Sequence, residues 1–256
     1  MASLSQMLVQ RSNRTVLDTA IQVLVCSVVL TIGPLIPNCA AQGPPTIEAE
    51  LSRYGIPLTE SGLRAALRDP RPQVRSLAAG ELSERKDVQS LVAIEQALKA
   101  EKQLLVRFNM ASALVTLKSD LGKNTLLQIC EDSSVPEGLR LQAASRLLDV
   151  DDDRCVPQVA AMLRTTRDPS SKASALLALS RAGTLPESQI GSIHPELVSN
   201  LRDPNPAIRQ YAGECIAAID DQAAAPELKT AIAIESDPTT KDRMENSLKA
   251  LECKRE

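Results

Sequence analysis

Residues 69–75 read Asp69-Pro70-Arg71-Pro72-Gln73-Val74-Arg75, and residues 203–209 read Asp203-Pro204-Asn205-Pro206-Ala207-Ile208-Arg209. Both copies hold an Asp-Pro pair, a second proline two residues later, and a branched apolar residue followed by arginine. Asp-Pro pairs also occur at residues 168–169 and 237–238. Aspartate caps a helix N-terminus, and proline both stops a preceding helix and fits the first positions of the next one. The motif therefore predicts a joint between two consecutive helices.

A basic residue recurs along the chain at spacings of 32, 33, 32, 37 and 32 residues. We call the six members the basic ladder: Arg75, Arg107, Arg140, Lys172, Arg209 and Lys241. Ala or Met lies three positions after each member, and Leu or Ile lies seven positions after each. At about 100° per residue these positions share an arc of about 80° on one helix. Each copy thus contains a helix with a narrow apolar stripe. The residue at the third position of this stripe lets another helix approach closely.

A second apolar segment precedes each ladder helix, at residues 63–67, 88–98, 126–129, 156–163, 197–201 and 228–232. The repeating unit is therefore helix, turn, helix over about 33 residues. One such pair cannot bury its apolar faces alone, so the units must stack into a continuous core. We predict an all-α solenoid over residues 54–256, with about six helix pairs in a right-handed superhelical array.

The recurring pattern Asp-Pro-x-Pro-x-[Val/Ile]-Arg-x-x-Ala resembles the HEAT repeat, particularly the short HEAT-like form also seen in phycobilisome lyase proteins. The resemblance covers most of the chain and implies an armadillo-like helical repeat fold. It says almost nothing about function, because this fold hosts many different partners. It also implies that the ladder residues are structural and pair with the joint aspartates of their own or the neighbouring unit. The alternative function for the ladder is a row that binds anions or acidic peptides.

Aromatic residues make up only 1% of the chain, and His194 is its single histidine. This composition excludes a multi-histidine metal site and an aromatic platform for single-stranded nucleic acid. The net charge of −3 provides no general attraction to nucleic acid. We therefore predict no cofactor, no metal and no nucleic-acid partner. Alanine-rich helix seams explain the scarcity of rings, and the scarcity disfavours a tetratricopeptide array.

The first 41 residues have the order of an export signal. Arg11 and Arg14 precede an uncharged, largely apolar run over residues 19–37, and small residues follow up to Ala41. Cleavage after Ala41 or Ala40 would release a periplasmic or envelope-associated protein, with residues 42–53 as a linker. Two alternatives stay open: a retained membrane anchor and lipidation at Cys39. In either of these the N-terminal segment would tether the protein to a membrane.

Four cysteines follow the predicted signal, and an exported protein can form disulfides. Cys130 and Cys155 fall on the first helices of units three and four, while Cys215 and Cys253 fall on or after the second helices of units five and six. We predict the pairs 130–155 and 215–253. The alternative is four small buried thiols. None of the spacings resembles a zinc motif.

Some residues beside the ladder leave the apolar stripe and are candidates for partner binding. They lie one or two positions after a ladder residue: Phe108, Asn109, Leu141, Gln142, Gln210 and Tyr211. We predict that they face the concave surface, where Phe108, Leu141 and Tyr211 would form an apolar patch for a partner. The alternative is that they pack against the next unit.

Three local features have ordinary structural interpretations. His194 precedes Pro195, so we expect it to be exposed near a helix start, without catalytic partners. Asp151-Asp152-Asp153 lacks the glycine and the distant glutamate of a calcium loop, so we predict a turn whose last aspartate caps a helix. The 37-residue interval between units four and five contains residues 183–188 and is about four residues longer than the other intervals, which predicts a surface loop there.

These features together predict an exported interaction module that binds a protein or peptide on its curved surface and is not an enzyme. A lyase-like or accessory HEAT-repeat enzyme is one alternative, although the sequence lacks the His-Glu pairs of HEAT-repeat metal hydroxylases. A purely architectural envelope protein is the other.

Overall fold

A computed structural model of the chain describes residues 46–183 and 185–254, which form thirteen α-helices, three short 3₁₀ helices and no strand. The predicted export signal lies outside the described residues. The α-helices are α2 (Ile47–Arg53), α3 (Glu60–Ala66), α4 (Pro72–Glu84), α5 (Leu91–Ala100), α6 (Leu104–Thr116), α7 (Asp120–Glu131), α8 (Glu137–Leu148), α9 (Val156–Thr165), α10 (Pro169–Leu179), α11 (Glu187–Asn200), α12 (Pro206–Ile219), α13 (Ala225–Ile234) and α14 (Pro238–Cys253). The 3₁₀ helices η1 (Val88–Ser90), η2 (Asp153–Cys155) and η3 (Gln222–Ala224) lead into α5, α9 and α13. Within this described part, no helix is long and apolar enough to cross a membrane.

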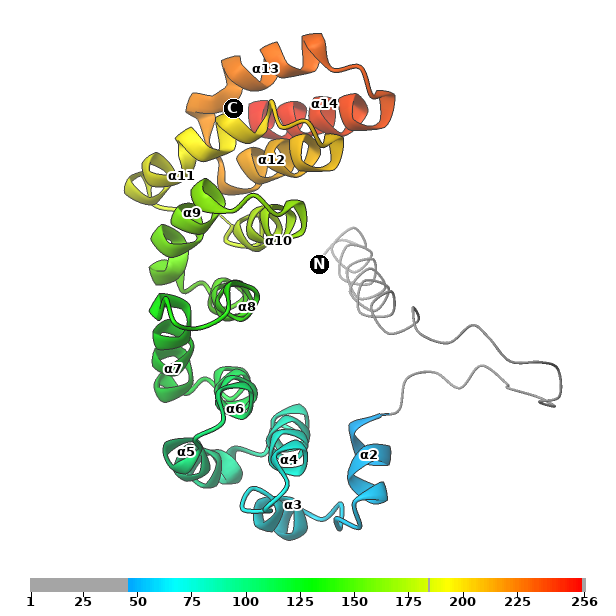
Figure 1. Cartoon of the computed structure of the whole chain (residues 1–256), viewed down its shortest axis with the longest axis vertical. Coiled ribbons are helices and arrows are strands. Elements are labelled where there is room, and N and C mark those ends of the chain that lie inside the picture. Colours follow the sequence, from blue (N-terminus) through cyan, green and yellow to red (C-terminus); the bar gives the residue numbers. More distant parts are fainter. Residues whose placement is uncertain (1–45, 184, 255–256) are drawn as a thin grey trace, which may run out of the picture. The chain divides into compact units, whose positions relative to one another are not determined.

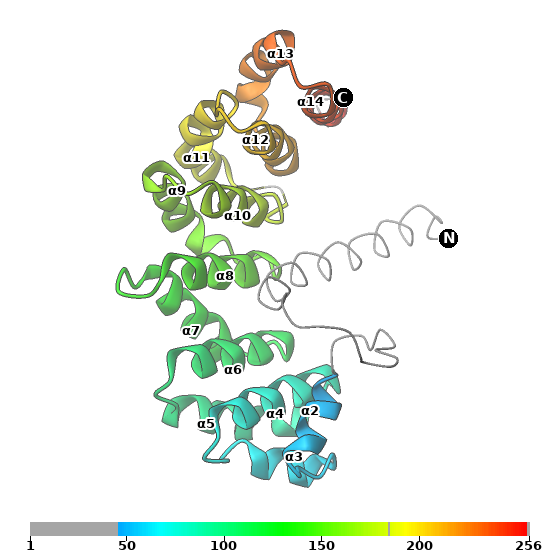
Figure 2. The same cartoon turned by 45° about the vertical axis from the view of Figure 1, so that its right-hand side comes forward.

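Helices α3 to α14 form six consecutive pairs that stack in chain order (Figure 1). The even-numbered helices α4 to α14 line the inner, concave side of the stack. The odd-numbered helices α3 to α13 form its outer layer (Figures 1 and 2). Each inner helix from α4 to α12 packs against the next inner helix. The predicted solenoid of six helix pairs is confirmed.

The core lies between the two layers, where the predicted stripe places it. The six residues three positions after the ladder, four alanines and two methionines, are all fully buried: Ala78, Met110, Ala143, Ala175, Ala212 and Met244. Gly122 of α7 shows how close the layers come, because a Cβ there would lie 2.7 Å from the Cβ of Leu114 and 2.8 Å from the carbonyl oxygen of Ala111. A side chain at this position would therefore push α7 away from α6.

The joints between paired helices follow two versions of the motif. Asp168 caps α10 and Asp237 caps α14, each with proline in the first helical position, as the sequence predicts. In α4 and α12 the first helical residue is instead the second proline of the motif. The preceding aspartate closes a turn there, since Asp69 Oδ1 accepts from the Arg71 N–H at 2.8 Å. In these two units Asp-Pro precedes the cap and does not form it.

Helix α2 occupies most of the segment that we expected to be a linker. Thr46 caps it by accepting a hydrogen bond from the Ala49 N–H, and its Leu51 is fully buried. The helix packs against α4, where Ile47 lies beside Gly80. The ordered array therefore begins before residue 54, with a single helix that covers part of α4.

Candidate functional site

The first rung of the ladder joins two units through Arg75. Its Nε donates to Glu101 Oε2 at 2.7 Å, and its Nη1 donates to the carbonyl oxygens of Asp69 and Pro70 at 2.9 and 3.1 Å. Glu101 follows α5 of the second unit, and its Oε1 accepts from the N–H groups of residues 102 and 103. Arg75 thus fixes its own joint and the end of the next outer helix.

The fifth unit repeats this arrangement. Arg209 donates to both carboxylate oxygens of Glu235 at 2.6 and 2.7 Å, and to the carbonyl oxygens of Asp203 and Pro204. The hydrogen bond from Arg209 lowers the pKa of Glu235 from 4.5 to about 2, although burial acts in the opposite direction. The same pair raises the pKa of Arg209. Both glutamates lie 26 residues after their arginine, a spacing that was available in the sequence and that we did not use.

The other ladder residues vary in their contacts. Lys172 Nζ lies 2.5 Å from Asp203 Oδ2, which is the predicted pairing with a joint aspartate of the next unit. Arg140 donates to the carbonyl oxygen of Cys130 at the end of α7. The side chains of Arg107 and Lys241 make no hydrogen bond or ion pair with the residues that the structure describes. Four of the six ladder side chains therefore have structural contacts, and glutamates take the place expected for aspartates at two of them.

The predicted apolar patch beside the ladder is wrong. Phe108 and Leu141 are only 7% and 3% exposed, so they belong to the core and offer no surface to a partner. Tyr211 is half-buried and packs against the same core. The physical reason is that the position directly after the ladder residue faces the neighbouring inner helix, so a ring there is covered when the units stack.

The inner surface instead carries the positions two and five residues after the ladder. We call these residues the inner strip: Leu77, Gly80, Asn109, Ser112, Gln142, Ser145, Ser174, Leu177, Tyr211, Glu214, Arg243 and Asn246. The predicted binding residues Asn109, Gln142 and Tyr211 belong to it, whereas Gln210 lies beside it and donates to Glu214 at 2.9 Å. From the first to the fourth unit the strip is uncharged, because its polar members are hydroxyl and amide groups.

Two hollows along the strip are lined by several of these polar residues. One of about 340 Å³ lies between α4 and α6, where Asn109 Nδ2 donates to Ser76 Oγ at 3.3 Å. The buried Oγ of Ser112, also in this hollow, has no hydrogen-bond partner among the described residues. The other, of about 300 Å³, lies between α8 and α10 and is lined by Gln142, Ser145 and Ser174. The strip can therefore donate and accept hydrogen bonds at several successive units.

Side-chain contacts also join the outer helices of neighbouring units, which sequence reasoning missed. Arg64 of α3 contacts Asp87 before η1 at 3.1 Å, and Arg164 of α9 contacts Glu196 of α11 at 2.6 Å. These partners lie 23 and 32 residues apart, so no fixed spacing identifies the series.

His194 takes part in the same outer series. It lies in the middle of α11, because Pro195 is inside the helix and does not begin it. His194 Nδ1 lies 2.8 Å from Asp221 Oδ2, and the Asp221 side chain is completely buried. Our expectation of an exposed histidine near a helix start is therefore wrong, since the His194 side chain is only 30% exposed and lies within the helix. Cys215 is also buried, and this burial raises the pKa of its thiol, which disfavours the reactive thiolate.

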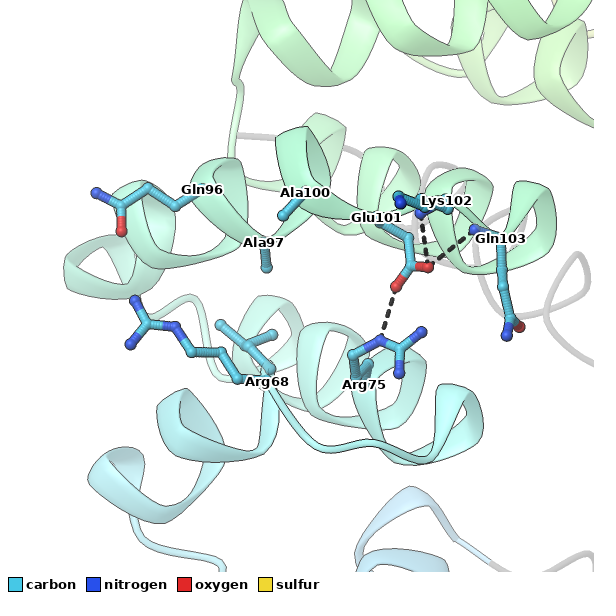
Figure 3. A pocket seen from close by; sticks show the side chains of 9 residues that line it. Arg68, Arg75, Gln96, Ala97, Ala100, Glu101, Lys102 and Gln103 are labelled. Carbon is cyan, nitrogen blue, oxygen red and sulfur yellow. Dashed lines mark hydrogen bonds and ion pairs between the residues drawn. The ribbon is translucent and has the colours of Figure 1, made fainter.

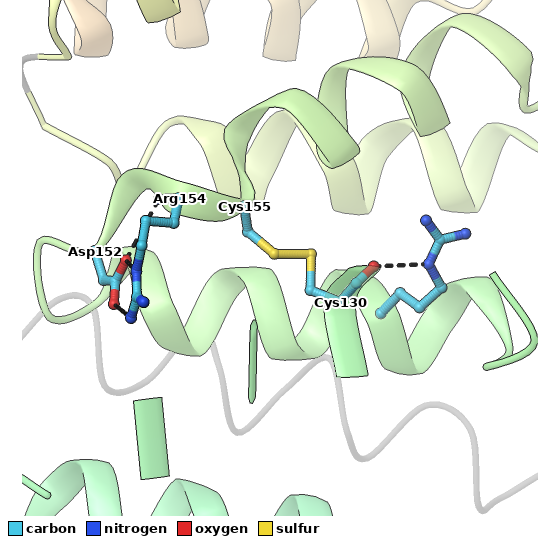
Figure 4. Close-up of a disulfide and its surroundings, with 5 residues drawn as sticks. Cys130, Asp152, Arg154 and Cys155 are labelled. Atoms are coloured by element: carbon cyan, nitrogen blue, oxygen red, sulfur yellow. Dashed lines mark hydrogen bonds and ion pairs between the residues drawn. A yellow bond between two sulfur atoms is a disulfide. The ribbon is translucent and has the colours of Figure 1, made fainter. Parts of the chain in front are cut away.

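One of the two predicted disulfides is present. Cys130 and Cys155 are joined, with their Cα atoms 6.5 Å apart, and the bond connects α7 to the start of α9 (Figure 4). Cys215 is buried and Cys253 is exposed, and neither is in a disulfide, so the second predicted pair is wrong. Beside the bond, Asp152 caps η2 and contacts Arg154 at 2.6 Å, so the middle aspartate of the acidic run is the cap, not the last.

Comparison with known proteins identifies the class of fold. No family model matches the chain, and no curated protein matches its sequence. A designed armadillo repeat protein in complex with the peptide (KR)4 covers 74% of this chain and 98% of its own length, with 13% identity and a TM-score of 0.52. A second designed armadillo repeat protein covers 75% and 100%, with 16% identity and a TM-score of 0.52.

The complex of CpcE and CpcF of phycocyanin lyase from Nostoc sp. PCC7120 covers 85% of this chain and 100% of that chain, with 20% identity and a TM-score of 0.38. The designed armadillo repeat proteins, together with the six stacked helix pairs, show that the described part of the chain is an armadillo-like α-solenoid. At these identities the likeness concerns the fold alone.

Proposed function

We propose that this chain is an exported scaffold that binds an extended, uncharged segment of a protein or peptide along the inner strip, without covalent chemistry. The observation that carries the proposal is the row of serine, asparagine and glutamine side chains at equivalent positions of the second to fourth units. Such side chains suit the N–H and C=O groups of an extended backbone, which need partners when they leave water.

The designed armadillo neighbour that holds (KR)4 supports peptide binding as a use of this architecture. The preference for an uncharged segment follows from this chain alone. The strip itself has no charged residue from the first to the fourth unit. The two hollows beside it are also lined by one acidic residue, Glu84, and two basic residues, Arg146 and Arg181, so a basic peptide finds no row of acidic partners there.

A peptide library selected on the full chain tests the proposal. We expect selected peptides to lose at least tenfold in affinity when Asn109, Gln142 and Ser174 are all changed to alanine. Val92 is exposed on the outer helix α5, so Val92→Ser is the matched control and should leave affinity unchanged. Peptides that bind the triple variant as tightly as the original chain would exclude the strip. If no peptide is selected, the architectural alternative gains support.

The proposed cellular address rests on residues 1–41, whose order of charge and hydropathy is that of a secretory signal. Mass spectrometry of the protein recovered from cells should find an N-terminus at Gln42 or Ala41. A lipid mass on Cys39 or an intact residue 1 would replace cleavage by one of the two alternatives.

A further inference from the structure

A hollow of about 590 Å³ opens on the edge of the stack that carries the joints (Figure 3). It lies between the α3–α4 joint and the end of α5. Leu67, Ala97 and Ala100 form an apolar floor, and longer polar side chains surround it: Arg68, Arg75, Gln96, Glu101, Lys102 and Gln103. The hollow shares no residue with the inner strip.

The charges around this hollow are unequal. Three cationic side chains line it, and Glu101 is the single carboxylate among its lining residues. That carboxylate already accepts hydrogen bonds from Arg75 Nε and from the backbone N–H groups of residues 102 and 103. The surplus positive charge therefore lies on Arg68 and Lys102, both exposed at the rim. It is a local feature, because the whole chain has a net charge of −3.

The fifth and sixth units provide an internal comparison. They repeat the sequence Leu-Arg-Asp-Pro at residues 201–204 and the same arginine–glutamate pair. At the positions of Ala100, Lys102 and Gln103, however, they carry Ile234, Ser236 and Asp237. The ladder pair therefore does not require the small floor or the added cation, which are particular to the first junction.

We propose that this hollow binds an acidic peptide segment, with an apolar side chain on Ala97 and Ala100 and carboxylates against Arg68 and Lys102. Burial of the apolar side chain removes apolar surface from water and therefore favours binding. Hydrogen bonds between carboxylate and guanidinium are charge-assisted and give the site its preference for acids. The proposal is independent of peptide binding at the inner strip.

A labelled peptide of alternating glutamate and leucine, titrated into the full chain by fluorescence anisotropy, tests the site. We expect binding that weakens as salt is added, because exposed charges are screened. The double change Arg68→Gln and Lys102→Gln should weaken binding at least tenfold. Arg202→Gln alters the equivalent arginine of the fifth unit and should leave binding unchanged.

Two further measurements separate the contributions that the alanine floor of the hollow and the carboxylates of the peptide make to binding. Ala100→Ile places in the hollow the side chain that the sixth unit carries and should abolish binding while every cation remains. A peptide with glutamine in place of glutamate should bind at least tenfold more weakly. Equal binding of both peptides, or equal losses in the Arg202 variant and the double variant, would overturn the proposal. Far-UV circular dichroism of each variant verifies that the helices remain.

Discussion

Arg75 Nε lies 2.7 Å from Glu101 Oε2, and this contact holds the first helix pair against the second. Arg209 and Glu235 repeat it at 2.6 Å in the fifth and sixth units. In both places the same arginine also donates to two carbonyl oxygens of its own joint. One side chain therefore sets both the start of an inner helix and the place where the next outer helix ends.

Removal of Arg75 should destabilise the fold. The side chain of Glu101 is only 5% exposed, so Arg75→Ala leaves a buried carboxylate without its cation. We expect a loss of about 3 kcal/mol in the free energy of unfolding, measured by urea denaturation. Arg53 forms a surface pair and is 68% exposed, so Arg53→Ala should cost less than about 1 kcal/mol. Equal losses in the two variants would show that the buried pair does not hold the units together.

Stability should fall in acid through Glu235. Its pKa is lowered from 4.5 to about 2 in the folded chain, so the folded state favours the ionised form. This contribution is present above pH 4.5 and is lost as the pH falls toward 2. Urea midpoints measured from pH 7 to pH 2 should therefore decrease over that window. Glu235→Gln should make the decrease shallower, and an unchanged slope would contradict the assignment.

The disulfide should contribute to stability under oxidising conditions. Cys130 and Cys155 are 25 residues apart, and a closed loop of that size corresponds to about 3.5 kcal/mol in the chain-entropy account. Cys155→Ser should lower the melting temperature, and a reductant should then have no further effect. Cys253 is exposed and should tolerate Cys253→Ser. If a reductant did not change the melting temperature of the original chain, the result would argue against the disulfide.

Removal of His194 should lower the free energy of unfolding, because the buried Asp221 then loses its hydrogen-bond partner. The aspartate side chain is fully buried, and its Oδ1 has no hydrogen-bond partner among the described residues. His194→Ala removes the partner of Oδ2 as well, and we expect a loss of about 1–3 kcal/mol in thermal or urea unfolding. Adding Asp221→Asn to this variant removes the buried charge and should recover part of the loss. No recovery would mean that His194 acts through packing.

Phe108 and Tyr211 should separate stability from binding. Phe108→Ala empties a core position and should cost about 3–5 kcal/mol of unfolding free energy. Tyr211 is half-buried at the inner strip, so Tyr211→Ala should cost less stability and should weaken peptides selected on the strip. Chemical denaturation measures the first effect and peptide anisotropy the second. If Phe108→Ala weakened peptide binding but left the free energy of unfolding unchanged, the predicted apolar patch would be supported after all.

The helix-pair repeat could be predicted from the sequence because it depends on interactions within a single unit. Proline in the first turn, a capping aspartate and an apolar stripe at helical spacing act within one unit, and six copies in register leave little choice of architecture. The sequence also indicated the ladder, since its members share one helix position. It did not reveal that Glu101 and Glu235 would receive the arginines, because their distance in space depends on how two units stack.

The errors have the same origin. Phe108 and Leu141 leave the stripe of their own helix, and the sequence therefore predicted exposure, but the adjacent inner helix covers them. His194 and Asp221 are 27 residues apart and meet only when the outer helices pack. One of the two predicted disulfides, Cys130–Cys155, is present. The other is absent, and Cys215 is instead buried in the core.

The sequence by itself determined that this protein is a stack of helix pairs, where four of the six pairs turn and which stripe each pair buries. These properties follow from backbone geometry within about 33 residues. Only the tertiary structure decided which side chains stay in contact with solvent and which charges meet. Those outcomes depend on the packing of one unit against the next, and so the uncharged inner strip and the cationic hollow at the first junction became visible only in the folded chain.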